Sequence, residues 1–297
     1  MKYYLGIDGG GTRTTAAVSD ENGNILLKKA GKTINFYSVG MQKARENLDS
    51  LIAQICNELN ISSFEAAFVG CSALDGEADA QTTQALCGGI NAVKKAMNSD
   101  VYIALKSLEC DSCPCIAICG TGSMAAGEDA NGNMLIAGGW GHIIGDEGSG
   151  YSIAINALKK CCELCDEGRS TPLLEKANRF FGVDDFRKAI DIIYSPETTK
   201  DVLASFAAEV GAICESDEDA QDIITNEAHS FAKTVMILLN KIKGCRTLGM
   251  YGGIFAHNDL FLQIFTQDIN SVYSDVKTVL LTTPPEEGAL KLARKLK

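Results

Sequence analysis

The chain has 297 residues, 46% of them hydrophobic, and a formal net charge of -11. This length and apolar share predict a sizeable core and two domains. The negative charge argues against nonspecific binding to nucleic acid or to an anionic membrane, both of which need a basic surface. No apolar run approaches the roughly 20 residues that span a bilayer, and Asp8 interrupts the N-terminal apolar run, so we expect a cytoplasmic protein without a signal peptide.

Strands and helices are expected to alternate in the first part of the chain. Apolar periodicity predicts strands near 3–8, 14–19 and 24–29, a helix near 41–59, a strand near 65–71, a helix near 78–97 and a strand near 101–105. This order indicates an α/β domain.

The second part begins with strands from Cys115 to Ala137 and becomes mainly helical from Ser149 to about Lys243. A strand at 247–251, a helix after His257 and a short basic helix opened by Pro285 follow. The predicted domains are residues 1–112 and 113–284. The second domain carries a helical insertion at 149–243, and the C-terminal helix 285–297 returns to the first.

One segment occurs twice, at an offset of 109 residues. Residues 11–26 read GTRTTAAVSDENGNIL and residues 120–135 read GTGSMAAGEDANGNML, so 9 of 16 positions are identical. Each copy reads as a glycine-rich turn, a strand, an Asn-Gly turn and a strand. The Asn-Gly pairs predict type I′ hairpin turns, in which both central residues have positive φ. The sequence therefore predicts a duplicated hairpin.

A glycine-rich turn ends the strand that precedes each hairpin: the first turn is residues 9–12 and the second turn is residues 120–123. Without side chains, backbone amides can approach an oxyanion, so we expect both turns to bind the phosphates of one ligand. A tight bend without a ligand is the alternative for either turn alone. Only the first copy has a carboxylate before its turn, Asp8 against Ala117, and Mg²⁺ is typically held by one or two carboxylates plus phosphates. Asp8 is the predicted metal ligand.

A third glycine-rich segment, residues 138–150, contains the single Trp, one of three His and two acids among six glycines. We name it the tryptophan loop. A carboxylate near an indole predicts sugar binding, because the carboxylate accepts hydroxyl hydrogen bonds and the indole packs on the apolar ring face. A tight turn with a carboxylate at a helix N-terminus is the alternative. His142 is expected to be a hydrogen-bonded structural residue rather than a base.

The chain has twelve cysteines, and without an export signal they are expected to be free thiols. Two clusters, residues 110–115 and 161–165, each contain a Cys-x-x-Cys spacing. Together they could supply four thiolates to zinc or to an iron-sulfur cluster. Small apolar side chains in a core are the alternative.

Four segments carry a family resemblance: LGIDGGGT at 5–12, CGTGS at 119–123, GGWGHIIGDEGS at 138–149 and YGGI at 251–254. With them the chain resembles, over essentially its whole length, N-acetylglucosamine kinases and the related BadF/BadG/BcrA/BcrD-type ATPases. The resemblance implies an α/β protein of two duplicated ribonuclease H-like domains, the actin/hexokinase/Hsp70 fold. It also implies ATP and Mg²⁺ in the cleft between the domains, a small amino sugar as substrate, and a possible homodimer.

The resemblance also implies the residues of each subsite. The implied nucleotide contacts are Asp8, Gly10, Gly11, Thr12, Gly120, Thr121, Gly122, Ser123, Gly252 and Gly253. The implied sugar contacts are Asn35, Gly139, Trp140 and Asp146.

The catalytic base is where the chain departs from the pattern. The sugar kinases place an Asp just after the strand that precedes the second turn, whereas the strand expected at 101–105 ends in Lys106. A protonated Lys cannot accept a proton, so Glu109 or Asp111 would have to substitute. Three functions stay open: an amino-sugar kinase with a displaced base, an ATPase that drives a redox partner through a cluster, and a nucleotide- and sugar-binding protein without turnover.

Overall fold

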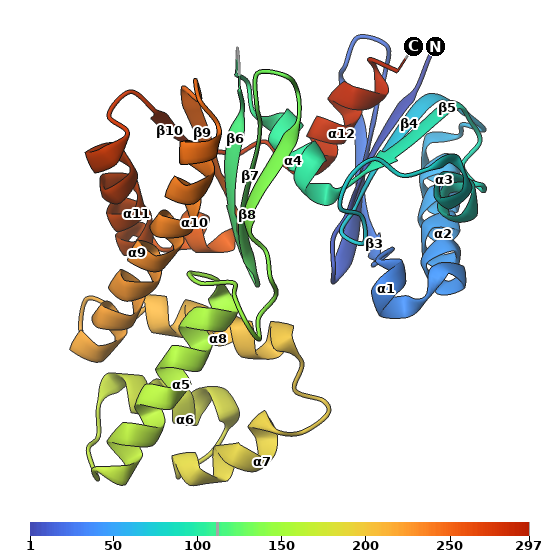
Figure 1. Cartoon of the computed structure of the whole chain (residues 1–297). Coiled ribbons are helices and arrows are strands. Elements are labelled where there is room, and N and C mark those ends of the chain that lie inside the picture. The colour runs from blue at the N-terminus through green and yellow to red at the C-terminus, as the bar shows by residue number, and fades with distance from the viewer. Residues whose placement is uncertain (111–112, 297) are drawn as a thin grey trace. The chain divides into compact units, whose positions relative to one another are not determined.

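The computed structural model describes residues 1–110 and 113–296, which form two compact units (Figure 1). Unit 1 is Met1–Glu109 with Thr282–Lys297, and unit 2 is Cys110–Leu281. The final segment of the chain thus belongs to the unit that the N-terminus begins.

Each unit is built on a five-stranded mixed sheet, and the two sheets have the same connectivity. The strand order is β3-β2-β1-β4-β5 in unit 1 and β8-β7-β6-β9-β10 in unit 2. The first three strands of each sheet are antiparallel, and the fourth strand then pairs in parallel with the first. The duplication seen in the hairpins therefore extends over both sheets, as the predicted α/β fold of two duplicated domains requires.

The sheet of unit 1 has helices on both faces (Figure 1). Its strands are β1 (Tyr4–Gly9), β2 (Arg13–Ser19), β3 (Ile25–Lys32), β4 (Phe64–Cys71) and β5 (Ala92–Asn98), and its helices are α1 (Phe36–Val39), α2 (Met41–Leu59), α3 (Ala80–Cys87), α4 (Asp100–Ser107) and α12 (Pro285–Ala293). Successive β4 side chains point to opposite faces. Ala67 and Val69 join the core beneath α2, whereas Phe68 packs with Ile103 of α4 and Ala289 of α12.

Two of the predictions for secondary structure in unit 1 are wrong. The helix expected at 78–97 is the short helix α3 followed by strand β5, and the strand expected at 101–105 is helix α4. Helix α3 ends at Gly88, and β5 is an edge strand, where lysines such as Lys94 are common because they oppose edge-to-edge pairing. Helix α4 begins where the Ser99 side chain accepts a hydrogen bond from the Tyr102 amide at 3.1 Å.

Helix α12 packs closely against β1 and α4 of unit 1, because glycines stand at the two points of contact. A Cβ at Gly6 of β1 would lie 2.4 Å from the Glu286 carbonyl oxygen, and one at Gly288 would lie 2.1 Å from the Ile103 carbonyl oxygen. The helix starts at Pro285, as predicted, and this packing places the buried Glu286 near the end of β1.

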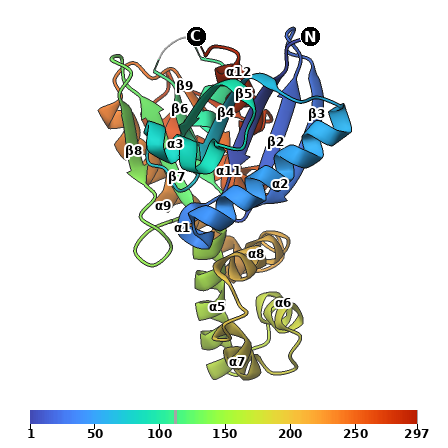
Figure 2. The ribbon, with the colours of Figure 1, turned by 90° about the vertical axis from the view of Figure 1, so that its right-hand side faces the viewer.

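Unit 2 contains the second sheet and the longer helices. Its strands are β6 (Cys115–Cys119), β7 (Ser123–Glu128), β8 (Met134–Gly138), β9 (Thr247–Tyr251) and β10 (Lys277–Leu280), and its helices are α5 (Gly150–Asp166), α6 (Pro172–Phe181), η1 (Phe186–Lys188), α7 (Ala189–Ile193), α8 (Lys200–Gly211), α9 (Glu218–Lys241), α10 (Gly253–His257) and α11 (Asp259–Val272). Figure 2 shows α5 to α8 gathered beyond one end of the sheet. The largely helical region after Ser149 is confirmed, while β10 and the short α10 were not expected.

The two hairpins share one turn structure, which is not the predicted type I′. Only the glycines, Gly23 and Gly132, have positive φ. In the first copy the Asp20 carboxylate accepts hydrogen bonds from the amides of Asn22 and Asn24, both at 2.9 Å, and the Asp129 carboxylate makes the equivalent bonds in the second copy. A type I turn fits this pattern, because the Gly23 amide bonds the Asp20 carbonyl at 3.2 Å. The Asp side chain, rather than the Asn-Gly pair, determines the turn.

Among the described residues, no helix is both long and apolar enough to cross a membrane.

Candidate active site

Unit 1 contributes a pair of carboxylates at the ends of two strands. Asp8 lies at the end of β1, and Asp100 is the first residue of α4, directly after β5. Burial raises the pKa of Asp8 to about 7, with further increases from the negative charges of Asp100 and Glu286 and an opposing effect of Arg13. Burial also raises the pKa of Asp100, whose carboxylate accepts a hydrogen bond from the Val101 amide at 2.8 Å. Both carboxyl groups are thus poised to bind a cation or a proton.

Asp100 is a candidate functional residue that the sequence patterns did not single out. The last strand of unit 1 before β6 and the second turn is β5, which ends at Asn98, so Asp100 lies two residues after the strand where the resemblance places the base. Lys106 is in the last turn of α4, and its ammonium group lies 5.1 Å from the ring centroid of Tyr102. Six residues of helix separate Asp100 from Lys106 by about 9 Å along the axis. The premise that Lys106 ends a strand is therefore wrong.

The structure does not support Glu109 or Asp111 as a replacement for the catalytic base. Glu109 has a largely exposed side chain that pairs with Lys291 at 3.4 Å. Asp111 lies outside the described residues. Asp100, two residues after β5, is thus closer along the chain to the predicted base position than either of them.

The first turn is tied to Asn35 by hydrogen bonds within unit 1. The Thr33 hydroxyl donates to the Gly10 carbonyl oxygen at 2.8 Å and accepts from the Asn35 amide at 3.0 Å. The Asn35 side chain caps α1 through its oxygen and donates through Nδ2 to the Ser72 hydroxyl at 3.0 Å. Nothing lies within 4 Å of a Cβ built on Gly11, so the turn is open on that side.

The second turn is hydrogen-bonded directly to the tryptophan loop. The Ser123 hydroxyl donates to the Glu147 carbonyl oxygen at 2.6 Å, and the Gly150 amide donates to the Gly120 carbonyl oxygen at 2.8 Å. The buried Cys119 thiol donates to the Gly148 carbonyl oxygen at 3.1 Å. The predicted phosphate turn and the predicted sugar loop of unit 2 thus form one hydrogen-bonded structure.

Within the tryptophan loop, the two predicted sugar contacts are in contrasting surroundings. Trp140 is 74% exposed, whereas Asp146 is 5% exposed. Asp146 has a φ of 64°, in the left-handed region, and its carboxylate pairs with the Lys200 ammonium at 3.0 Å. His142 packs edge-on against Tyr151, with ring centroids 4.8 Å apart.

Glu227 of α9 holds the end of the tryptophan loop. Its buried carboxylate accepts hydrogen bonds from the Gly148 amide and from Asn156 Nδ2, both at 2.5 Å. Gly148 has a φ of 82°, and a Cβ there would lie 2.5 Å from the Phe231 Cβ. Glu227 lies 79 residues along the chain from Gly148, so no local sequence pattern could have revealed this support.

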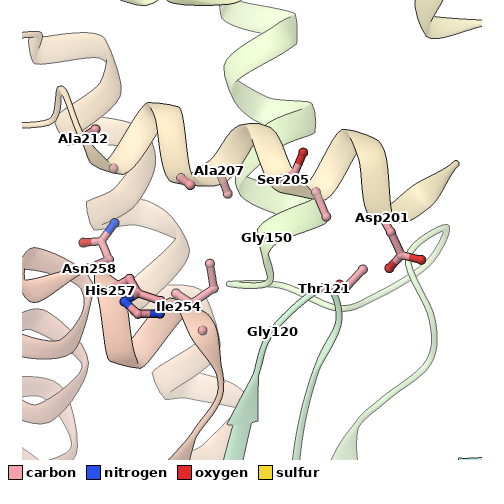
Figure 3. Close-up of a pocket in the computed structure, with 14 residues that line it drawn as sticks. Gly120, Thr121, Gly150, Asp201, Ser205, Ala207, Ala212, Ile254, His257 and Asn258 are labelled. Atoms are coloured by element: carbon pink, nitrogen blue, oxygen red, sulfur yellow. The ribbon is translucent and has the colours of Figure 1, made fainter. Parts of the chain in front are cut away.

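A cavity of about 580 Å³ opens beside the second turn within unit 2 (Figure 3). Its walls are Gly120 and Thr121, the α5 start at Gly150, the small side chains of α8, and α10 with His257 and Asn258. Three alanines and one glycine of α8 line a broad, mainly apolar part of this space. Gly253 lines this cavity. Gly252 packs against β6, since a Cβ there would lie 2.2 Å from the Cys119 carbonyl oxygen.

The cysteine clusters do not form a metal site in the part of the chain that the structure describes. No group of three or more His, Cys, Asp or Glu there is arranged to hold a metal ion. All twelve cysteines are free thiols, and Cys161 is buried in the core while Cys162 is exposed.

Comparison with known proteins agrees with this arrangement. Residues 5–293 match the sequence profile of the BadF/BadG/BcrA/BcrD ATPase family. The chain belongs to this family. Its members are ATPases by description, so ATP use is a family property that fits the cavity and the two turns.

Relatives of known name cover the whole chain. The chain is 29% identical over 302 residues to an N-acetylmuramic acid/N-acetylglucosamine kinase of Clostridium acetobutylicum, covering 99% of both proteins. It is 25% identical over 319 residues to an N-acetyl-D-glucosamine kinase of Dictyostelium discoideum, covering 98% of both. Among solved structures, a proposed N-acetylglucosamine kinase from Chromobacterium violaceum superposes with a TM-score of 0.76 at 20% identity, over 99% of each chain. That last likeness shows the shared fold.

Proposed function

We propose that this protein transfers the γ-phosphoryl group of ATP to a hydroxyl group of an amino sugar such as N-acetylglucosamine. The observation that carries the proposal is the hydrogen-bonded assembly of the second turn and the tryptophan loop beside the cavity of unit 2. A phosphate-binding turn joined to a sugar-binding loop suits a reaction that moves phosphate onto sugar. Whole-length similarity to amino-sugar kinases supports the same assignment.

The nucleoside is assigned to the cavity of unit 2, and phosphate binding is assigned to the residues of the first turn and of the second turn. Small side chains on α8 accommodate the nucleoside, and Gly120 and Thr121 end the cavity at the second turn. Phosphoryl transfer depends mainly on positioning and charge stabilisation, so a backbone turn held by Ser123 and Gly150 provides a rigid support.

Asp100 is assigned as the general base that accepts the proton of the attacking sugar hydroxyl. Burial raises its pKa, and a raised pKa makes a carboxylate a better proton acceptor near neutral pH. Its position directly after β5 matches the family pattern without any displaced residue. We therefore assign no catalytic role to Lys106.

The residues of unit 1 fit a magnesium ion bound with the nucleotide. The pKa of about 7 at Asp8 reflects burial next to other carboxylates, an arrangement that a divalent cation would relieve. Mg²⁺ usually takes one or two carboxylates and completes its shell with water and phosphate oxygens, so a cluster of three protein ligands is not required. When bound, the ion would neutralise charge on the phosphates.

The sugar is assigned to Asn35, Gly139, Trp140 and Asp146. The exposed indole of Trp140 offers an apolar face for a sugar ring, and Asp146 and Asn35 offer polar groups for its hydroxyls and amide. Asp146 keeps one carboxylate oxygen bonded to Lys200, so the other oxygen is the assigned acceptor.

The test is ADP release by the purified protein with Mg·ATP and either no sugar, N-acetylglucosamine, N-acetylmuramic acid, glucosamine or glucose. Release that saturates with an amino sugar, at a rate at least about tenfold above the sugar-free rate, would support the proposal. Equal release with and without sugar would favour an ATPase that acts on a partner. Nucleotide binding without any release would favour a binding protein.

A further inference from the structure

The ion pair of Lys200 and Asp146 lies directly against the second turn. Lys200 begins α8, and its Nζ is 3.0 Å from Asp146 Oδ2. A Cβ built on Gly122 would lie 2.8 Å from that same Oδ2 and 3.4 Å from the Lys200 Nζ. Both charged groups therefore occupy the space over the glycine in the middle of the turn.

Lys200 reaches this position with part of its side chain still accessible. The Lys200 side chain is 31% exposed, against 6% for that of Asp146. Its ammonium group is also 6.0 Å from the ring centroid of Tyr151, and the Tyr151 amide bonds the Thr121 carbonyl oxygen at 3.3 Å. The Asp146 carboxylate is thus enclosed, while about a third of the Lys200 side chain is accessible.

The neighbouring cavity wall has little positive charge of its own. None of the described residues that line it is Lys or Arg, and the wall includes the acidic Asp201. The whole chain carries a net charge of -11. A bound triphosphate needs cationic groups or a metal ion near its terminal oxygens, and Lys200 places an ammonium group at the turn that supplies Gly120 and Thr121 to the cavity.

We propose that Lys200 binds the terminal phosphoryl group of the nucleotide while remaining paired with Asp146, the assigned sugar contact. The inference rests on the proposed function, and it adds a residue that links the phosphate and sugar subsites. Asp146 would otherwise present an unpaired negative charge next to the phosphates, which Lys200 neutralises. Because the ammonium group has three donors, it can bond the carboxylate and a phosphate oxygen together.

The test is a comparison of nucleotide affinities by calorimetry, without sugar and without turnover. A nonhydrolysable ATP analogue and ADP, each with Mg²⁺, are titrated into wild type and Lys200→Met. We expect the variant to lose about tenfold or more in affinity for the analogue, because a charge-assisted bond is removed, and less than about threefold for ADP. Lys200→Arg should recover most of the loss.

Two further variants control for a misplaced buried charge and for the general loss of a lysine. Lys200→Met leaves Asp146 buried and unpaired, so a double variant with Asp146→Asn removes both charges and should show the same preferential loss of analogue binding. Lys188→Met, which removes a surface lysine paired with Asp184, is the matched control and should change neither affinity.

The outcomes separate this inference from the proposed function. The inference would be overturned by equal losses of affinity for the analogue and for ADP, or by no loss of affinity in Lys200→Met and in the double variant. Either result would leave the kinase assignment intact. A wild-type protein that binds neither nucleotide would overturn the proposed function and the inference together.

Discussion

The two copies of the hairpin share a backbone but differ in chemistry. In unit 1 the strand before the turn ends in Asp8, with the charge of Asp100 close enough to affect its pKa. In unit 2 the equivalent position is the buried Ala117, and the turn is instead bonded to the tryptophan loop and borders a cavity. The first copy thus lies beside a pair of carboxylates, and the second lies beside the tryptophan loop and a cavity. The comparison teaches that the two units share strand order and turn while the residues around each turn differ.

The largest effect on activity should come from removing Asp100, the second of the two carboxylates of unit 1. Asp100→Asn keeps the shape of the side chain but cannot accept the hydroxyl proton, so kcat should fall by about 100-fold or more. Calorimetry should show nucleotide affinity close to that of wild type. Lys106→Met, six residues further along α4, is the comparison variant and should stay within about threefold of wild-type activity. If Lys106→Met were the more damaging change, Asp100 would not be the base.

The pH dependence of nucleotide binding tests the role of Asp8, the other carboxylate of unit 1. Its pKa of about 7 means that it is largely protonated in the ligand-free protein at lower pH. A metal ion needs the carboxylate form, so affinity for Mg·ADP should increase as the pH is raised through 7. In Asp8→Asn the affinity should be weaker, and this pH dependence should be lost. An unchanged profile in the variant would assign the titration to another group.

The same pKa predicts an effect of Asp8 on the stability of the ligand-free protein. The folded form holds a proton that the unfolded chain releases near 3.8, so stability from this group declines as the pH rises from about 4 to about 7. Asp8→Asn should therefore be more stable than wild type above about pH 7, by about 1 to 3 kcal/mol, and the difference should vanish near pH 4. Denaturant unfolding at several pH values measures it. A difference of opposite sign would mean that Asp8 is ion-paired.

A larger side chain in the cavity of unit 2 tests whether the nucleoside binds there. Ala208 is exposed and lines the cavity, so Ala208→Leu should obstruct the nucleoside and raise the KM for ATP about tenfold, with a KM for sugar near wild type. Val202→Leu, which adds one methylene group at an exposed position of the same helix outside the cavity lining, is the control. Equal effects of the two variants would place the nucleoside elsewhere.

Substitutions in the hairpin turns, which both copies share, should have the smallest effects on the protein. Asp20→Ala and Asp129→Ala each remove a carboxylate that accepts several amide and Asn hydrogen bonds, so each should lower the melting temperature by about 2–4 °C at neutral pH. Hydrogen bonds from Asn24 lower the pKa of Asp20, and those from Asn133 lower the pKa of Asp129, so the losses should shrink as the pH falls below 3.8. A large effect on activity would contradict a purely structural role.

Much of this molecule could be predicted from local sequence patterns. The duplicated hairpins, both turns, the tryptophan loop and the helix opened by Pro285 all depend on residues within a few positions of each other. The failure at 78–105 has a local cause: the apolar run at 101–105 is compatible with a strand or a buried helix, and periodicity cannot separate the two. Ser99 followed by Asp100 was the available signal for a helix start.

The supports of the site could not be predicted, because they join distant parts of the chain. Lys200 meets Asp146 across 54 residues, and Glu227 meets Gly148 across 79. Neither pair leaves a local pattern. The turn type was missed for a different reason, since the Asp20 side chain competes with the Asn-Gly preference for a type I′ turn.

The most direct test of the account is mass spectrometry of N-acetylglucosamine after incubation with Mg·ATP and either wild type or Asp100→Asn. The account predicts that wild type adds one phosphoryl group to the sugar, and that Asp100→Asn yields little product in the same time although it binds nucleotide. An unmodified sugar with wild type, under conditions in which nucleotide is bound, would contradict the assignment of a kinase. Equal product from both proteins would contradict the division of chemistry between the two copies.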